Sequence, residues 1–320
     1  MSRILVTGAN GQIGTELVGA LARRYGGDRV LATDLQDGPR SNKNGSTRYE
    51  SLDVTDAGAL QIAIKHNKID TIYHLASLLS ASGEQHPDRS WDVNVNGLKH
   101  VLDFARESGC HVFWPSSIAV FGPETPRENT PQRSILDPNT MYGVTKVAGE
   151  LLCRYYCRKF GVDVRSVRYP GLISYTTPPG GGTTDYAVEM FYAAVEESEY
   201  VCFVRPDTQL PMMYMPDAIR AALELMDAEG SRISVRTSYN IGAASFTAGQ
   251  LADAIARRLP GFTVRFEPDH RQEIADSWPS SVDDSKARED WGWEPSFDAG
   301  AIVDDMLKNL YAKKSIDVKS

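Results

Sequence analysis

A glycine-rich turn near the start of the chain restricts the fold more than any other feature of the sequence. The segment "LVTGANGQIG" (Leu5–Gly14) places Gly8, Gly11 and Gly14 between a β-branched run and a run with helical periodicity. The first glycine permits a tight turn, the second lets the backbone approach a pyrophosphate, and the third lets the helix pack closely on the strand. The N–H groups at the start of the helix, and its dipole, favour phosphate. The segment therefore predicts a dinucleotide-binding βαβ unit rather than a merely tight strand–helix turn.

The first half of the chain repeats this alternation of strands and helices. Short β-branched runs predict strands at Arg3–Gly8, Arg29–Asp34, Asp70–Ala76, His111–Ser117 and Asp163–Gly171. Longer amphipathic runs between them predict helices at Gly14–Gly26, Gly58–Asn67, Asp92–Gly109 and within Asn139–Gly161. Strands separated by helices of this length are typical of βαβ units. We therefore expect an α/β protein with a Rossmann-like, doubly wound parallel sheet, which binds ligands beyond the carboxyl ends of its strands.

The pattern changes near Pro170. A long loop rich in Gly, Pro and Thr, "YPGLISYTTPPGGGTTDYA", leads into shorter mixed elements such as Ser238–Gly242 and Thr247–Leu259. We expect residues 1–170 to form the Rossmann domain, with some later segments returning to it. Residues 171–320 are expected to form mainly a smaller mixed α/β lobe that binds the substrate. The last residues, "KKSIDVKS", look frayed.

Composition and charge argue against several classes of protein. The formal net charge is −8, whereas a nucleic-acid binder usually carries a basic face, so we expect no nucleic-acid partner. No apolar run approaches the roughly 18 residues that span a bilayer, and "MSRILVTGAN" enters a strand at once without a signal peptide. We therefore expect a cytoplasmic protein with no membrane partner. Cys153 and Cys157 are interpreted as packing residues, and no histidine pair has metal-ligand spacing, so no metal is expected.

Two acidic residues indicate which dinucleotide binds. Asp34 ends the second predicted strand, where its carboxylate can accept hydrogen bonds from the ribose hydroxyls of adenosine. It would repel a 2′-phosphate, so NAD is favoured over NADP, and Arg40 is the one nearby residue that could soften this choice. Asp53 in "LDVTD" could meet the adenine amine, or it could cap the next helix, a role that Thr55 or Asp56 could also fill.

Three residues from separate segments could form an acid–base site. Tyr142 and Lys146 are four residues apart, so they share one face of a helix, and Ser117 ends the strand before that helix. A free tyrosine, with a pKa of about 10, is a poor base at neutral pH, and a nearby ammonium and a positive nicotinamide would both lower that pKa. Ser117 can orient the oxygen of a substrate. A second match, Tyr155 and Lys159, points roughly 140° away, so we interpret it as ordinary helix surface.

These motifs together resemble the extended short-chain dehydrogenase/reductase superfamily. The first half carries the resemblance in "TGANGQIG", "HLAS" (His74–Ser77), "PSSIAVFG" and "YGVTK". The second half resembles the epimerase-like L-threonine 3-dehydrogenases through three longer signatures, "RYPGLISYTTPPGGGTTDYAVEMFYAA", "LPMMYMPDA" and "WPSSVDDSKAREDWGW". That family often has threonine where Ser117 stands, and both residues supply a hydroxyl.

The resemblance implies an NAD site, an acid–base trio and a small substrate pocket. The cofactor-binding residues that it implies, together with those derived above, are Gly8, Asn10, Gly11, Gln12, Ile13, Gly14, Asp34, Leu35, Asp53, Val54, Leu75, Ala76, Ser77, Asn94, Tyr142, Lys146, Tyr169, Gly171 and Leu172. The catalytic residues are Ser117, Tyr142 and Lys146. The candidate substrate-binding residues are Ser80, Ser117, Tyr142, Gly182, Thr183, Thr184 and Trp278.

The reaction that the resemblance implies is oxidation of the β-hydroxyl of L-threonine by NAD⁺ to 2-amino-3-ketobutyrate, with Tyr142 as the base. The glycines of "GGGTTD" (Gly180–Asp185) make that loop mobile, which suits a lid, and Thr183 and Thr184 could donate to the substrate carboxylate. Thr184 could alternatively cap the helix that follows. Trp278 is either pocket wall or core.

Two rival functions stay open. A nucleotide-sugar 4-epimerase or dehydratase would use the same serine, tyrosine and lysine, although a dehydratase usually has acidic residues beside the serine, where this chain has Ile118 and Ala119. A redox-sensing NAD-binding protein without catalysis tends to lack the tyrosine or the lysine. Members of the resembling family usually dimerise through two helices, here Asp92–Gly109 and Met141–Phe160, so we expect a homodimer. The methionines of "LPMMYMPDA" are expected to pack between the lobes.

Overall fold

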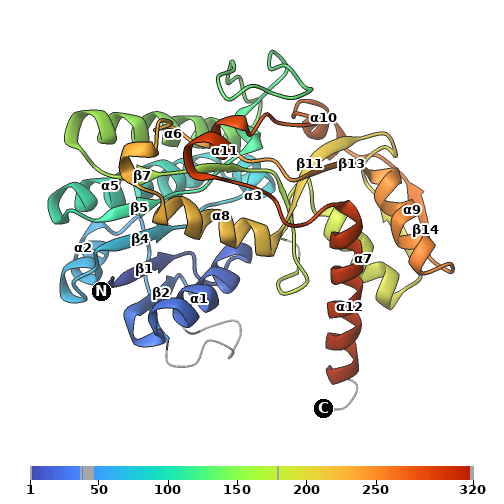
Figure 1. The fold of residues 1–320 in the computed structure, drawn as a ribbon, viewed down its shortest axis with the longest axis horizontal. Helices are drawn as coiled ribbons and strands as arrows, with labels where there is room; N and C mark the ends of the chain where they lie inside the picture. Colours follow the sequence, from blue (N-terminus) through green and yellow to red (C-terminus); the bar gives the residue numbers. More distant parts are fainter. Residues whose placement is uncertain (1, 37, 39–46, 179, 318–320) are drawn as a thin grey trace.

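A parallel sheet forms the centre of the first half of the chain (Figure 1). The computed structural model describes residues 2–36, 38, 47–178 and 180–317. Within these ranges the sheet has six strands in the order β3-β2-β1-β4-β5-β7, namely β1 (Ile4–Thr7), β2 (Val30–Asp34), β3 (Arg48–Ser51), β4 (Thr71–His74), β5 (His111–Phe113) and β7 (Val164–Arg165). The strands pair in parallel, and their order reverses between β1 and β4. The predicted Rossmann-like sheet is confirmed, and such sheets bind ligands where the strand order reverses.

Helices cover both faces of this sheet. One face packs against α2 (Ala57–His66), α5 (Gly97–Ser108) and α6 (Met141–Phe160), and the other against α1 (Gln12–Tyr25), α8 (Met215–Asp227) and α11 (Ser285–Trp291). In β1, Ile4 and Val6 enter the core beneath α1 and α8, whereas Leu5 enters the core beneath α2, α5 and α6. Side chains alternate between the two faces of a strand, and both faces are covered, so the strands consist of continuous apolar runs.

Two segments that the sequence predicts as single strands are divided in the structure. The segment 111–117 forms β5 and β6 (Ser116–Ser117), and the segment 163–171 forms β7, β8 (Val167–Tyr169) and the start of β9 (Gly171–Ile173). β6 pairs with β8, which in turn pairs with β12 (Tyr239–Asn240). Pro115 and Pro170 lie at two of the breaks, where proline lacks the N–H group that a continuous ladder needs. The division places Ser117 directly beside Tyr169.

The second lobe is built on a core of its own. It contains α7 (Tyr186–Glu196), β10 (Glu199–Cys202), β11 (Gln209–Tyr214), β13 (Ala244–Thr247), α9 (Ala248–Arg258), β14 (Thr263–Phe266), α10 (Arg271–Asp276) and α12 (Ala299–Asp317). Met212 belongs to this core, whereas Met213 and Met215 belong to the core beneath α1 and α8, and all three are fully buried. None of the three lines the catalytic cavity, and their packing between the lobes stays a prediction.

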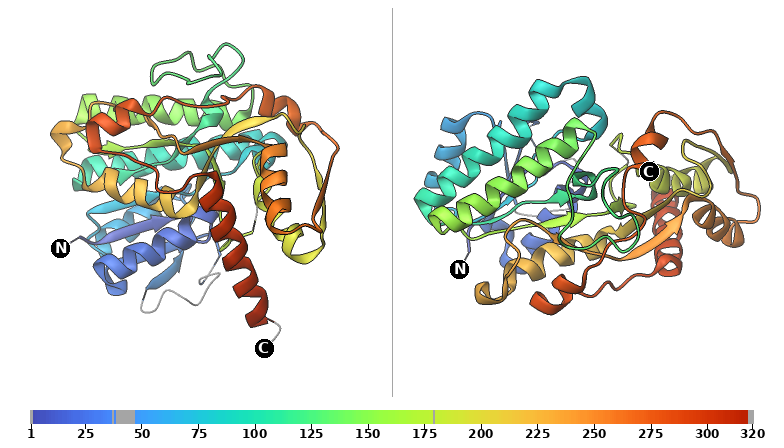
Figure 2. Two further views of the ribbon diagram at one scale, coloured as in Figure 1. Left: turned by 45° about the vertical axis from the view of Figure 1, so that its right-hand side comes forward. Right: turned by 90° about the horizontal axis from the view of Figure 1, so that it is seen from above.

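The connection from β4 to α5 and the end of the chain complete the fold. The connection contains α3 (Ser80–Gln85), α4 (Pro87–Trp91) and a π-helical turn, Asp92–Asn96, so the predicted helix at 92–109 begins with this turn. Helix α12 projects away from the body of the molecule and includes Lys313–Asp317, so the prediction that this end frays is wrong for those residues (Figure 2). Residues 318–320 lie outside the described ranges. Across the described residues, no helix is long and apolar enough to cross a membrane.

Candidate active site

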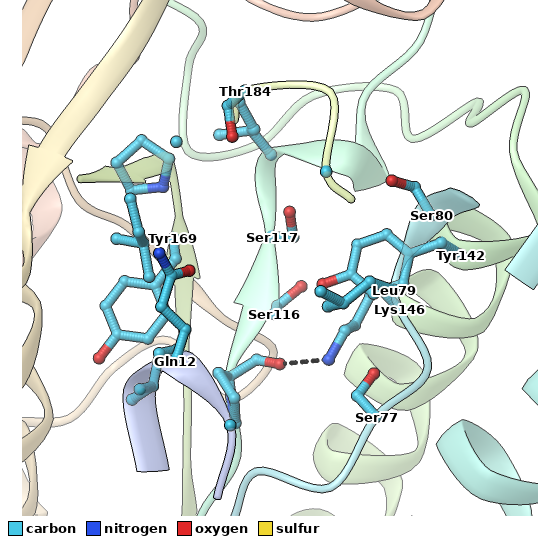
Figure 3. Close-up of a pocket in the computed structure, with 18 of the residues that line it drawn as sticks. Gln12, Ser77, Leu79, Ser80, Ser116, Ser117, Tyr142, Lys146, Tyr169 and Thr184 are labelled. Atoms are coloured by element: carbon cyan, nitrogen blue, oxygen red, sulfur yellow. Dashed lines mark hydrogen bonds between the residues drawn. The ribbon is translucent and has the colours of Figure 1, made fainter. Parts of the chain in front are cut away.

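Two adjoining cavities lie at the carboxyl end of the parallel sheet. The first, here called the catalytic cavity, is lined by every predicted substrate-binding residue: Ser80, Ser117, Tyr142, Gly182, Thr183, Thr184 and Trp278 (Figure 3). It is also lined by the predicted cofactor residues Gly8, Gly11, Gln12, Ile13, Gly14, Leu75, Ser77, Lys146, Tyr169, Gly171 and Leu172. The second, here called the Asp34 cavity, is lined by Asp34, Leu35, Asp53, Val54 and Ala76, and it shares Gly8, Gly11, Leu75 and Ser77 with the first.

The glycine turn between β1 and α1 is as compact as the sequence predicts. Gly8 has a φ of +68°, and a Cβ added there would lie 2.7 Å from the backbone nitrogen of Ala76. A Cβ at Gly14 would lie 2.2 Å from the carbonyl oxygen of Gly8. Gly11 occupies the N-cap position of α1 and no side chain caps this helix, so the N–H groups of its first turn face the cavity without a side-chain acceptor. Such a cradle fits the pyrophosphate of a dinucleotide.

The acidic residues of the Asp34 cavity are held by backbone N–H groups. The Asp34 carboxylate accepts hydrogen bonds from the N–H of Asn10 at 3.0 Å and from the N–H of Leu35 at 2.8 Å. Asp53 accepts from the N–H and the hydroxyl of Thr55, whereas Asp56 caps α2 by accepting from the N–H of Ala59. The alternative interpretation of Asp53 as the helix cap is therefore wrong. Arg40, which was expected to influence the choice of cofactor, lies outside the described residues.

Ser117, Tyr142 and Lys146 converge in the catalytic cavity. Tyr142 stands in the first turn of α6, whose N-cap, Thr140, accepts from the N–H of Gly143. Ser117 lies beside Tyr142 on the wall of this cavity, and the Nζ atom of Lys146 lies 5.4 Å from the centre of the Tyr142 ring. Lys146 Nζ also donates to the carbonyl of Pro115 at 2.8 Å, the dashed line in Figure 3. The second tyrosine–lysine match is on the surface instead, since Tyr155 is 53% exposed.

Burial dominates the ionisation of the tyrosine and the lysine. It raises the pKa of Tyr142 to about 12, although the hydrogen bond from Ser117 opposes this change. Burial also lowers the pKa of Lys146 to about 7, opposed by the nearby Cys153 and Glu150. Desolvation of the phenolate therefore dominates in the protein without its cofactor, and the lowering of the Tyr142 pKa by the ammonium together with a bound nicotinamide stays a prediction.

The far end of the catalytic cavity carries hydroxyls and one carboxylate. Asp185 lines it beside Thr183 and Thr184, and its carboxylate accepts hydrogen bonds from the N–H groups of Gly181 at 2.7 Å and Gly182 at 2.6 Å. Burial raises the pKa of Asp185, opposed by these bonds. Asp185 rather than Thr184 occupies the N-cap position of α7, and no side chain caps that helix, so the alternative role of Thr184 as a cap is wrong.

Trp278 combines the two interpretations that the sequence allows. It is 5% exposed and belongs to the core of the second lobe, and it also lines the catalytic cavity. Its Nε1 atom has no hydrogen-bond partner among the residues that the structure describes. A buried N–H donor usually has a partner, so this one is suited to an acceptor on a bound molecule.

Comparison with known proteins agrees with this geometry. A family model described as the NAD dependent epimerase/dehydratase family matches residues 4–242. The chain belongs to this family. A relative from Staphylococcus haemolyticus, described as an uncharacterized epimerase/dehydratase, is 48% identical and covers 98% of this chain and 99% of its own length.

Two solved structures of L-threonine dehydrogenases are similar along nearly the whole chain. The GalE-like L-threonine dehydrogenase from Cupriavidus necator, in its holo form, is 53% identical with a TM-score of 0.94, and the match covers 96% of this chain and 99% of that chain. A monomeric L-threonine 3-dehydrogenase from a metagenome, in its apo form, is 49% identical with a TM-score of 0.93, and the match covers 97% of this chain and 99% of that chain. The predicted resemblance to L-threonine 3-dehydrogenases is confirmed.

NAD is the cofactor of the epimerase/dehydratase family, and this chain fits it. The glycine turn provides the pyrophosphate cradle, and Asp34 provides acceptors for ribose hydroxyls. Tyr142 and Lys146 are on the wall of the adjoining cavity, where the nicotinamide half would be held. The sequence analysis missed Arg89, whose side chain lines the Asp34 cavity, and Asp185.

Two predicted cofactor residues, Asn10 and Asn94, line neither cavity. Asn10 instead anchors Asp34 through its backbone N–H and donates from Nδ2 to the carbonyl of Gly38. Asn94, in the π-helical turn, accepts from the N–H of Leu78 at 2.8 Å and donates from Nδ2 to Thr145 Oγ1 at 3.0 Å. Both residues therefore support cavity-lining segments, and their contact with NAD stays a prediction.

Proposed function

We propose that this epimerase/dehydratase family member oxidises L-threonine at C3 with NAD⁺, producing 2-amino-3-ketobutyrate. The observation that carries the proposal is the catalytic cavity itself, in which Tyr142, Lys146 and Ser117 face a polar end formed by Thr183, Thr184 and Asp185. Sequence identity of 53% and 49% to two L-threonine dehydrogenases supports the same substrate.

The chain's own residues provide the proton transfer. Ser117 holds the substrate hydroxyl, and Tyr142 accepts its proton as the bond from C3 to hydrogen breaks. Lys146 stabilises the phenolate from one helical turn away. When bound, NAD⁺ supplies the hydride acceptor and a positive charge that adds to that of Lys146 in favouring the phenolate.

A free amino acid also needs partners for its two charged groups. Asp185 is the only carboxylate among the described residues that line the catalytic cavity, so it is the counter-charge for the substrate ammonium. The hydroxyls of Thr183 and Thr184 and the Nε1 of Trp278 can donate to the substrate carboxylate. A nucleotide sugar has no ammonium for Asp185 to bind, which favours threonine over the epimerase substrate class.

Mixing purified protein with NAD⁺ and L-threonine tests the proposal by absorbance of NADH. Stoichiometric release of NADH with L-threonine, and a slower reaction or none with L-serine, are expected. A nucleotide sugar serves as the comparison substrate. Conversion of the sugar with NADH retained on the protein, and no NADH from threonine, would contradict the proposal and support the epimerase.

The homodimer predicted from the resemblance has a candidate surface on α6. Leu151 and Tyr155 are 46% and 53% exposed and, with Trp91 and Val95, line a mainly apolar groove on the side of α6 away from Tyr142, which Arg154, Arg158 and Lys159 also line. A second copy of the chain would bury this groove, as two helices from each subunit can form a four-helix contact. Light scattering tests whether the protein is a dimer. A monomeric mass at working concentration would contradict the dimer and would match the monomeric relative instead.

We also propose a cytoplasmic location. All four cysteines, Cys110, Cys153, Cys157 and Cys202, are free, and reduced thiols are typical of the cytosol, where NAD is available. Fractionation of the producing cells followed by detection of the protein tests this location, and recovery from an extracellular fraction would contradict it.

A further inference from the structure

Glu150 is a fully buried carboxylate close to the acid–base site that the proposed mechanism does not use. It lies on α6, one turn beyond Lys146 and two turns beyond Tyr142, and its exposed fraction is 0%. Burying a carboxylate away from water is costly unless other groups pair with it. Its partners therefore show what it stabilises.

The Glu150 carboxylate joins α6 to two adjacent strands. Its Oε1 atom accepts from Ser116 Oγ at 2.8 Å and from Arg168 Nε at 2.8 Å, and its Oε2 atom accepts from Arg168 Nη2 at 2.7 Å. Ser116 and Arg168 are directly paired residues of β6 and β8. Arg168 also donates to the carbonyl of Gln132 and to Asn240 Oδ1, so the two-pronged ion pair is itself held in place.

Three consecutive residues before α6 each contact a different turn of that helix. The carbonyl of Pro115 accepts from Lys146, Ser116 donates to Glu150, and Ser117 lies beside Tyr142 in the catalytic cavity. Ser116 is the middle residue of this segment, so its bond to Glu150 fixes the backbone between the two residues that reach Lys146 and Tyr142. Movement of Ser116 would displace Ser117, because the two residues share one short strand.

We propose that Glu150 is a positioning residue that holds Ser117 beside Tyr142 through Ser116 and Arg168, and whose negative charge favours the ammonium form of the neighbouring Lys146. This inference rests on the proposed oxidation of threonine. It assigns to Glu150 a role in the ionisation of Lys146, one turn earlier, and in the alignment of Tyr142, two turns earlier.

The surroundings of Lys146 make the charge of Glu150 important. Lys146 faces Tyr142, Cys153 and Glu150 on its own helix, the Trp114 ring and the Pro115 carbonyl on the β5–β6 segment, and His74 on β4. Burial lowers the pKa of His74 to about 3, so the histidine adds no second positive charge beside Lys146 at neutral pH. Cys153 is buried, and burial raises its thiol pKa far above neutral, so Glu150 is the anion that supports Lys146 at neutral pH among the described groups.

The test compares Glu150→Gln with Asp290→Asn. Asp290 is a matched control because it is also buried and accepts from Ser234 and Tyr239, but it lines neither cavity. In Glu150→Gln we expect kcat with threonine to fall by about 10- to 100-fold, as for a displacement of about 1 Å in a catalytic group. The inflection of the kcat profile should move up by about one pH unit, since Tyr142 loses the support of Lys146.

Binding of NADH provides a readout that does not need threonine. As Lys146 loses its proton, affinity for the anionic cofactor falls, and the midpoint of this fall should occur at lower pH in Glu150→Gln than in the unchanged protein. The control Asp290→Asn should lower the melting temperature. It should change neither the inflection of the kcat profile nor the pH midpoint of NADH binding. Unshifted midpoints in a folded Glu150→Gln protein would overturn the proposal, even if its kcat is low.

A milder variant covers the case in which Glu150→Gln does not fold. Ser116→Ala keeps the ion pair and removes only the contact to the strand, so kcat should fall by about 3- to 10-fold with unshifted midpoints. Wild-type kcat in Ser116→Ala would refute the positioning role. If the unchanged protein fails to oxidise threonine, the proposed function fails instead, and the NADH midpoints still decide the role of Glu150.

Discussion

The two ends of helix α6 carry the same tyrosine–lysine spacing in opposite surroundings. At the first end, Lys146 is 3% exposed, and Tyr142 meets Ser117 in the catalytic cavity. At the second end, Tyr155 contacts only the rings of Tyr156 and Phe160 among the aromatic contacts of the described chain, and it lines an apolar surface groove. The comparison shows that a four-residue spacing creates a helix face, whereas the segment that faces it creates the site.

The difference follows from helix geometry and from the break at Pro115. Thirteen residues along a helix turn the direction of a side chain by roughly 140°, so only one of the two pairs can face β6. The strand that reaches Tyr142 does so because β5 ends at Phe113 and β6 begins at Ser116. One end of α6 therefore lines the catalytic cavity, and the other lines the surface groove.

Removing the two tyrosine hydroxyls should give the largest contrast. In Tyr142→Phe we expect kcat with threonine to fall by about 100- to 10,000-fold, because the general base is lost, with NAD affinity nearly unchanged. Tyr155→Phe should retain the activity of the unchanged protein. Steady-state NADH production and fluorescence titration with NAD⁺ measure the two quantities. Equal activity in Tyr142→Phe would refute the base assignment.

The two lysines should differ next, in both rate and pH dependence. The unchanged enzyme should be slow at low pH and faster as Tyr142 deprotonates, since burial raises its pKa and only the phenolate is a base. Lys146→Met should lower kcat by about 100-fold and move the inflection to higher pH, because the supporting cation is gone. Lys159→Met should leave the profile in place. A flat profile for the unchanged enzyme under single-turnover conditions would contradict this prediction.

Stability should change in the opposite direction to activity at Lys146. Its pKa falls from the usual 10.5 to about 7 in the folded protein, which corresponds to roughly 5 kcal/mol in favour of the neutral form. Below pH 7 the lysine is charged in both the folded and the unfolded state, so burial of the charge lowers the free energy of unfolding by the full amount. This destabilisation declines as pH rises from about 7 towards 10.5, where the unfolded lysine also loses its proton.

Lys146→Met should therefore raise the unfolding free energy by about 1–3 kcal/mol at pH 6.5, after the lost bond to Pro115 is subtracted, and by less at pH 10. Chemical denaturation at the two pH values measures the change. Lys159→Met is the matched control and should be neutral at both. Destabilisation by Lys146→Met at pH 6.5 would contradict the burial cost.

The smallest effect on activity is expected at the exposed end of α6. Leu151→Glu places a charge among the apolar residues of the groove and should convert the proposed dimer to a monomer, while kcat stays within about threefold of the unchanged value. Light scattering and NADH assays on the same sample measure both properties. Loss of activity together with the dimer would show that the two ends of α6 are coupled.

The sequence predicted those parts of the fold and site that depend on local patterns. The alternation of strands and helices gave the doubly wound sheet, and the spacing of Gly8, Gly11 and Gly14 gave the turn that the structure contains. The helical phase correctly separated Tyr142 from Tyr155. The breaks at Pro115 and Pro170 were missed, although the prolines themselves were a usable signal.

Other site residues had no local signal that revealed their role. Asn94 stands in a helix-like run, and only its bonds to Leu78 and Thr145 show that it supports a loop. Asp185 follows two threonines in a glycine-rich loop, and only the cavity shows that its carboxylate lines the same wall as their side chains. In both cases the function of the side chain depends on segments far away in the chain.

By itself, the sequence determined the type of fold, the dinucleotide turn and the one helix face that could hold an acid–base pair. These properties follow from periodicity and spacing within a few turns or strands, which act over short distances along the chain. Only the tertiary structure decided the burial of that pair and the contacts of Glu150. Burial and pairing depend on which distant segments meet, and here Ser116, Glu150 and Arg168 come from three separate elements.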